Sequence, residues 1–204
     1  SENLIKKGLV IDTLLDSLIL TKGVSADDLV TGDKNAVMVA ARILAYGPEY
    51  VCDVLNPSTQ EVVQQTFNLA DCPFKKLPEG INNEFELKLP ISKIEVKFKL
   101  LTGKEEKIIQ AELDGMKKMG SSVLPELTTR LRHSIVEVDG KTEQNIINEF
   151  VNTSLLSRDS LVLRQEILRV SPDIQMKQEA DLGNETVEVD IPMTVDFFWP
   201  KANG

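Results

Sequence analysis

The chain has one histidine, two cysteines and one tryptophan in 204 residues. With His133 as the single histidine, a site of paired histidines is excluded, and a nucleophilic triad would have to be built around that residue. Cys52 and Cys72 supply at most half of a tetrahedral zinc shell. We therefore expect His133 to be structural, both thiols to be free in a reducing compartment, and no metal or other cofactor to be bound.

Long apolar runs and an excess of basic residues are also missing. No stretch reaches the roughly 18 apolar residues that would span a bilayer, and no basic region followed by an apolar signal core opens the chain. The 23 Lys and Arg against 32 Asp and Glu give a formal net charge of −9. This charge opposes binding to phosphate backbones and anionic lipids, so we expect a cytoplasmic protein with neither nucleic acid nor a membrane as partner.

Catalytic motifs are missing as well. Gly103-Lys104 lacks the preceding glycine of a phosphate-binding loop, and no Gly-x-Gly-x-x-Gly occurs. Acidic pairs such as Asp27-Asp28 and Glu105-Glu106 are explained as solvated faces or helix starts. The sequence therefore predicts a protein that is not an enzyme, although an acid/base pair of carboxylates is only unsupported and not excluded.

A hydrophobic content of 42% is enough for one large domain or two small subdomains, and the patterns in it predict an α+β fold. Apolar spacing and capping residues predict helices at residues 9–20, 33–46, 102–119, 143–152 and 159–170. We expect an N-terminal helical arm at 1–22 and an α+β domain at 23–204. That domain could also consist of two subdomains, 23–120 and 121–204.

The remaining segments predict antiparallel β-hairpins. Residues 50–55 and 62–69 flank one polar turn, and residues 174–180 and 185–191 flank another. These turns lie where a zinc ribbon carries its paired cysteines, but neither turn supplies two thiols. We therefore expect degenerate zinc-ribbon-like hairpins that bind no metal. Residues 127–138 favour β structure, at least at the end of the segment, before the Asp139-Gly140 turn.

Strict alternation at residues 84–89 and 94–100 predicts a third hairpin with a defined register. If Leu89 pairs with Ile94, three charged pairs face each other on one side and two apolar pairs on the other. The expected pairs are Lys88 with Glu95, Glu86 with Lys97, Glu84 with Lys99, Leu87 with Val96, and Phe85 with Phe98.

Two apolar segments near the ends of the chain are candidates for partner binding. Residues 9–20 carry Val10, Leu14 and Leu18 at intervals of four, which is typical first of a core helix and, as the alternative, of an arm that docks on a partner. Phe197, Phe198 and Trp199 are adjacent, and three such rings on a regular strand cannot all point into one core. At least one ring is therefore a candidate to face a partner, and the alternative is that all three only close the last strand onto the body of the protein. If they bind a partner, replacing Phe198 or Trp199 by alanine should weaken binding without unfolding the protein; unfolding would instead place them in the core.

Four blocks of sequence resemble the baseplate hub family of T-even-type bacteriophages. They occupy residues 31–50 (Thr-Gly-Asp-Lys-Asn-Ala-Val-Met and onward), 89–101, 135–140 and 189–200, in an order and spread that cover nearly the whole chain. The resemblance implies relatives that carry cysteine knuckles in two hairpins. Here those positions hold Asn56-Pro-Ser-Thr59 and Asp181-Leu-Gly-Asn184, which argues against zinc but not against the fold.

The resemblance implies a late protein of phage tail assembly, made in the host cytoplasm and needed to build the baseplate hub. It implies contacts with other hub proteins, as a hub component that reaches the virion tail or as an assembly chaperone, and no reaction. Self-association is left open. The alternatives are a tail-tip hydrolase that aids envelope penetration, which would depend on His133 or a carboxylate pair, and a zinc-dependent module.

Overall fold

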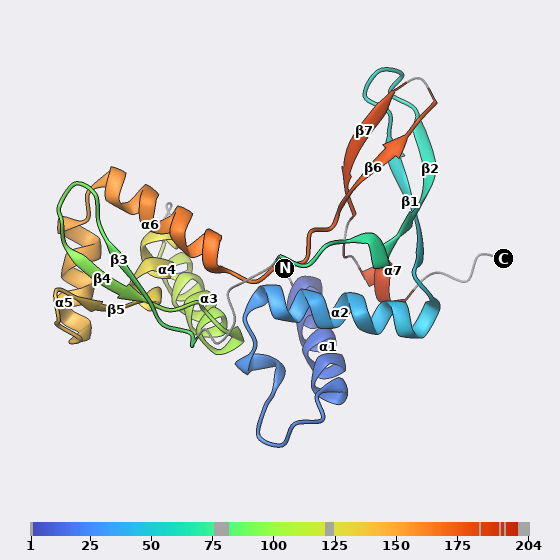
Figure 1. Cartoon of the computed structure of the whole chain (residues 1–204). Helices are drawn as coiled ribbons and strands as arrows, with labels where there is room; N and C mark the ends of the chain where they lie inside the picture. The colour runs from blue at the N-terminus through green and yellow to red at the C-terminus, as the bar shows by residue number, and fades with distance from the viewer. Residues whose placement is uncertain are drawn as a thin grey trace. The chain divides into compact units, whose positions relative to one another are not determined.

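The computed structural model describes residues 2–75, 82–120, 125–183, 185–191, 193 and 195–199, with side chains from residue 10 onward except at 195 and 196. Helices and small antiparallel sheets make up an α+β fold, as expected (Figure 1). The chain forms two compact units. Unit 1 comprises Ser1–Ala26, Gly32–Lys76 and Pro172–Gly204, and unit 2 comprises Asp27–Thr31 and Leu77–Ser171.

Each unit is formed from segments that are separated in the sequence, so a division of the chain at one residue cannot reproduce the two units. The expected subdomain boundary between residues 120 and 121 lies inside unit 2. The segment expected to form an N-terminal arm belongs to unit 1, and its Leu15 is fully buried in the core of that unit.

Unit 1 combines helices with two β-hairpins that share one apolar core. Its elements are α1 (Glu2–Leu18), α2 (Thr31–Tyr46), β1 (Glu49–Leu55), β2 (Val62–Asn68), η2 (Leu69–Asp71), β6 (Lys177–Asp181), β7 (Thr186–Asp190) and α7 (Val195–Phe198). The short helix η1 (Ala26–Asp28) begins with the last residue of a unit 1 segment and continues into unit 2. The helix α2 ends at Tyr46, and the next residue, Gly47, has a φ of 82°, the left-handed conformation that follows many helices. The hairpins β1–β2 and β6–β7 lie side by side (Figure 1), and the Gln178 side chain donates to the carbonyl of Asn68 at 2.6 Å.

The two hairpins of unit 1 confirm the strand predictions. In the first turn, the buried Asn56 side chain accepts hydrogen bonds from the backbone N–H groups of Ser58 and Thr59, at 2.9 and 3.1 Å. In the second, Asp181 accepts from the N–H of Gly183 at 2.8 Å, while Asn184 lies outside the described residues. Hydrogen-bonding side chains thus close both turns, and the comparison with zinc ribbons stays a prediction.

Unit 2 is built around a three-stranded antiparallel sheet with the order β3-β4-β5. Its elements are β3 (Phe85–Lys88), β4 (Glu95–Phe98), α3 (Gly103–Lys118), α4 (Glu126–Ser134), β5 (Ile135–Val138), α5 (Gln144–Glu149), the π-helical turn η3 (Phe150–Ser154) and α6 (Ser157–Val170). Phe98 from the sheet, Leu131 from α4 and Leu163 from α6 meet in one buried core.

The register predicted for β3 and β4 is confirmed at four of its pairs: Phe85–Phe98, Glu86–Lys97, Leu87–Val96 and Lys88–Glu95. The charged side chains form the expected ion pairs, with Lys97 Nζ 3.6 Å from Glu86 and also 3.2 Å from Glu137 of β5. The expected pairing of Glu84 with Lys99 lies outside this ladder, because β3 begins at Phe85 and Lys99 pairs with Glu105 at 2.6 Å.

The β structure expected at residues 127–134 is wrong. This segment is the helix α4, and only residues 135–138 form a strand. The helix buries Leu131 and Ser134 at a spacing of three, and Arg130 pairs with Glu126 at 3.2 Å across one helical turn. Packing on one face therefore overrides the weak β preference of the threonines and the histidine.

Where the segments of unit 1 meet, the backbone of Gly32 lies against Pro172. A Cβ on Gly32 would sit 1.7 Å from the carbonyl oxygen of Pro172. Beside it, Lys75 N–H donates to Asp173 and Gln175 N–H donates to Pro73, both at 2.9 Å. The middle and C-terminal segments of unit 1 are thus held together by backbone contacts that leave no space for a side chain at residue 32.

Replacing Gly32 by alanine is expected to lower the free energy of unfolding by about 1–3 kcal/mol or more, because backbone atoms must shift to admit the methyl group. The measurement is urea unfolding followed by circular dichroism. Gly115→Ala is the matched control, since its Cβ would meet nothing within 4 Å on a helix. That variant should be stabilised by roughly 0.5–1 kcal/mol; equal effects of the two substitutions would contradict the packing described here.

Candidate partner-binding site

The last turns of α2 carry a buried arginine that connects three segments of unit 1. Arg42 donates through Nη1 to the carbonyl of Gly47 at 3.2 Å and through Nη2 to that of Glu49 at 3.5 Å. These carbonyls lie at the end of α2 and the start of β1. The positive charge is thereby placed at the negative end of the helix dipole, where it is favourable.

Aromatic rings surround the Arg42 guanidinium. Its central carbon lies 4.7 Å from the ring centroid of Tyr46 and 5.8 Å from that of Tyr50. The ring of Phe197 on α7 lies 5.9 Å away. A cation over ring faces is attracted to their negative charge, more strongly when it is withdrawn from water.

The rings continue toward the C-terminal end as a chain of edge-to-face contacts. Centroid distances are 5.0 Å between Tyr50 and Phe197, 5.0 Å between Phe197 and Phe198, and 6.1 Å between Phe198 and Trp199. We name Arg42 and the five rings the aromatic cluster: Arg42, Tyr46, Tyr50, Phe197, Phe198 and Trp199.

The aromatic cluster has buried and exposed members. Tyr50, Phe197 and Phe198 are buried, whereas Tyr46 is 53% exposed and Trp199 is 43% exposed. The sequence argument assumed a regular strand for these residues, and that assumption is wrong, because residues 195–198 form the short helix α7. This helix buries Phe197 and Phe198 and leaves Trp199 partly exposed. A surface role is open to Trp199 and not to Phe197 or Phe198 as they are packed here, and partner binding by these residues stays a prediction.

The other predicted partner-binding residues lie on α1. Val10 and Leu18 are about half exposed, whereas Leu14 packs against the core of unit 1 next to the buried Leu15. Asp12 pairs with Lys34 of α2 at 3.2 Å. The helix therefore serves the core of unit 1 and still presents apolar atoms at the surface; whether these bind a partner stays a prediction.

Sequence reasoning missed Arg42, Tyr46 and Tyr50. The available signal was their spacing, an arginine followed by tyrosines four and eight residues later, around the helix-ending Gly47. The first tyrosine lies one helical turn from the arginine, but the second comes after the turn. Nothing in the local pattern indicates that Phe197, more than 150 residues away, completes the group.

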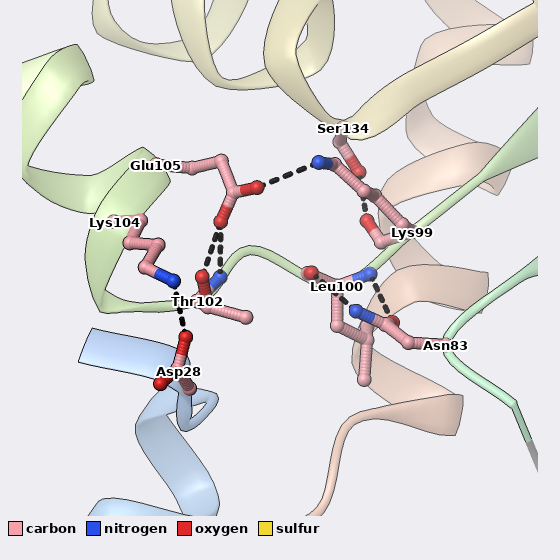
Figure 2. Close-up of polar contacts among 8 residues, drawn as sticks. All are labelled: Asp28, Asn83, Lys99, Leu100, Thr102, Lys104, Glu105 and Ser134. Carbon is pink, nitrogen blue, oxygen red and sulfur yellow. Dashed lines mark hydrogen bonds and ion pairs between the residues drawn. The ribbon is translucent and has the colours of Figure 1, made fainter. Parts of the chain in front are cut away.

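A second polar cluster fastens α3 in unit 2 (Figure 2). The Glu105 carboxylate accepts from the N–H of Thr102 at 2.9 Å and from Lys99 at 2.6 Å, and it also contacts the Thr102 hydroxyl. This is the capping box predicted from Thr102-Gly-Lys-Glu105. Lys104 pairs with Asp28 at the same end of the helix.

Glu105 is held as a carboxylate by these contacts. Partial burial raises its pKa, but the hydrogen bonds from Lys99 and Thr102 outweigh that effect and lower the pKa to about 2. A carboxylate whose acceptors are occupied by its own unit is suited to stabilising structure rather than to accepting a proton from a substrate.

His133 also has a carboxylate partner. Its Nε2 lies 3.1 Å from one oxygen of Glu112, whose other oxygen lies 2.5 Å from Arg132. The hydrogen bond from Arg132 is the main cause that lowers the pKa of Glu112. These contacts give His133 a structural partner between α3 and α4.

The structure adds two findings about metals and membranes. Within the described ranges, no group of three or more His, Cys, Asp or Glu side chains could hold a metal ion. Among those same residues, no helix is both long and apolar enough to cross a bilayer. Cys52 and Cys72 are free, and burial raises the pKa of the Cys52 thiol, with a further contribution from Asp53.

Comparisons with known proteins return no match: no protein-family model, no curated protein and no solved structure is significantly similar to this chain. The resemblance to baseplate hub proteins therefore depends on the four sequence blocks alone.

The different burial of Phe198 and Trp199 predicts different losses of stability when each is replaced by alanine. Phe198→Ala should lower the free energy of unfolding by about 3–5 kcal/mol, because it leaves a cavity among packed rings. Trp199→Ala should cost less than about 1.5 kcal/mol, because that ring is partly solvated and loses one edge contact. Chemical unfolding of both variants checks the order, and a larger loss for Trp199→Ala would refute the assignment.

The lowered pKa of Glu105 predicts a pH dependence of stability. A depressed carboxyl pKa stabilises the folded state above the unfolded value of 4.5, and this stabilisation is lost as the pH falls toward about 2. On the order of 2–3 kcal/mol should disappear in the wild-type chain over that window. Glu105→Gln should be less stable than wild type at neutral pH, and the difference in unfolding free energy between the two proteins should decrease as the pH is lowered.

The measurement is the unfolding free energy in urea from neutral pH down to about pH 2, which covers the whole window of the shift. Glu149→Gln, at an exposed position on α5, is the control and should follow the wild-type curve. A constant gap between Glu105→Gln and wild type would show that the loss does not come from the charge of Glu105.

Proposed function

We propose that this chain is a non-enzymatic assembly protein that binds other proteins of a phage baseplate hub, through the part of unit 1 that exposes Trp199 and Tyr46. The observation that carries the binding role is the aromatic cluster. Two partly exposed rings rest on a buried arginine and three packed rings.

The chemistry of these rings suits protein recognition. Tryptophan and tyrosine present a large apolar face together with a hydrogen-bonding group, and both are enriched at the residues that dominate binding energy. Because Phe198 and Phe197 hold the segment that carries Trp199, little side-chain or backbone freedom has to be lost when a partner binds. Exposed apolar atoms of Val10 and Leu18 on α1 offer a second contact in the same unit.

The phage context is supported by the sequence resemblance. Residues 31–50 contain α2 with Arg42 and Tyr46, and residues 189–200 contain α7 and Trp199. Two of the four resembling blocks thus contribute the residues of the aromatic cluster. In this proposal the chain acts late in infection, in the host cytoplasm, either as a hub component or as an assembly chaperone.

The experiment that tests this role is capture of hub proteins by the tagged full-length chain in infected cells, quantified by mass spectrometry. Wild type should enrich one or more baseplate hub proteins, and Trp199→Ala should reduce that enrichment by at least about tenfold while the chain remains folded. Phe74→Ala, which removes an exposed aromatic ring of unit 1 outside the cluster, should capture as well as wild type.

Absence of hub proteins from the wild-type capture would overturn the proposal. Equal capture by wild type and Trp199→Ala would contradict the role of the aromatic cluster in binding hub proteins. Quantifying the chain in purified particles separates the two modes: a fixed copy number indicates a hub component, whereas abundance in cells together with absence from particles indicates a chaperone.

A further inference from the structure

The outward face of α6 in unit 2 carries a stripe of arginine and leucine side chains. The helix turns Asp159, Leu163 and Val170 toward the interior of the unit, where they are buried. On its opposite face lie the exposed residues that we name the α6 stripe: Arg158, Leu161, Arg164, Gln165, Leu168 and Arg169.

The spacing of the α6 stripe is that of a helix-pairing seam. Arg158, Leu161, Gln165 and Leu168 follow each other at intervals of three, four and three, which keeps them on one line along the helix. Leu161 is 45% exposed and Leu168 is 71% exposed. Two leucines one heptad apart on a solvated helix face give a second helix apolar contacts to pack against.

The charge of the stripe is opposite to that of the whole chain. All three of its charged residues are arginines, although the chain has a net charge of −9. Of the two acidic residues in α6, Asp159 is fully buried, and Glu166 is partly buried and accepts two hydrogen bonds from Arg169, both at 2.7 Å. Arg164 donates to the carbonyl of Ser160 on its own helix, so its guanidinium stays at the surface.

The helix that carries the stripe is fastened at both ends. The buried carboxylate of Asp159 accepts the backbone N–H groups of Ile91 and Ser92 at 2.8 and 2.9 Å, which ties the first turn of α6 to the β3–β4 turn. At the other end, Val170 is buried in the core of unit 2. A partner would therefore meet a preorganised surface.

We propose that the α6 stripe binds an acidic amphipathic helix of another protein, with leucine-like residues against Leu161 and Leu168 and carboxylates against Arg158 and Arg164. A second copy of this chain is the less favourable occupant, because pairing two stripes would bring arginines against arginines. Nucleic acid and anionic lipid are opposed by the net charge of −9. This surface lies in unit 2 and is independent of the aromatic cluster in unit 1.

The test uses the full-length chain and a labelled helical peptide with leucines along its seam and glutamates on both flanks. A matched peptide carries lysines in place of the glutamates. Fluorescence anisotropy up to about 1 mM protein covers the weak affinity expected of two heptads. The glutamate peptide should bind wild type at least about tenfold more tightly than the lysine peptide does.

Charge reversal makes the test specific. The double variant Arg158→Glu/Arg164→Glu should bind the glutamate peptide about tenfold more weakly than wild type does, and the lysine peptide about tenfold more tightly. Leu161→Ser/Leu168→Ser should bind neither. Thermal unfolding should show all variants folded, because the substituted side chains are exposed. The milder variant Arg158→Gln/Arg164→Gln should have an affinity for the glutamate peptide between that of wild type and that of the charge-reversed variant.

Equal binding of the two peptides, or no effect of charge reversal, would overturn the proposal. Sedimentation that shows a dimer lost in the leucine variant would instead assign the stripe to a second copy of the chain. Binding of duplex DNA or of phosphatidylserine vesicles that is lost on charge reversal would assign it to an anionic polymer or surface. None of these outcomes depends on Trp199, so they leave the proposed role of the aromatic cluster to its own experiment.

Discussion

The fold of unit 1 depends on the contact between the backbones of Gly32 and Pro172. At this point the unit must bring together segments that are separated by more than 130 residues of sequence. Only glycine allows the first turn of α2 to approach the proline carbonyl so closely. The adjacent hydrogen bonds between residues 73–75 and 173–175 extend the contact, and the two hairpins and α7 then share one core.

Elements whose pattern is local were predictable from the sequence. The β3–β4 register followed from strict alternation, because both the charged pairs and the apolar pairs favour the same alignment, as Glu86–Lys97 and Phe85–Phe98 illustrate. The helix start at Thr102 was likewise predictable, since a capping box is a pattern of four consecutive residues. In contrast, α4 was missed because its helical state depends on burying Leu131 against residues distant in sequence.

The candidate site was only half predictable for the same reason. An aromatic run near one end of the chain is visible in the sequence, but the division into buried Phe197 and Phe198 and exposed Trp199 depends on what packs beneath them. Arg42 supplies that support, and a lone arginine in an apolar helix carries no local sign of three rings around it. Similarly, the α6 stripe could be recognised only after the buried face of the helix was known.

The interrupted layout of the two units has a consequence for the order of folding during synthesis. Unit 2 is complete once residue 171 has left the ribosome, whereas the core of unit 1 lacks β6, β7 and Phe197 until the last part of the chain emerges. At about 5–20 residues per second, the N-terminal helices wait for several seconds with apolar faces uncovered. Nascent chains would therefore depend on chaperones for unit 1 more than for unit 2.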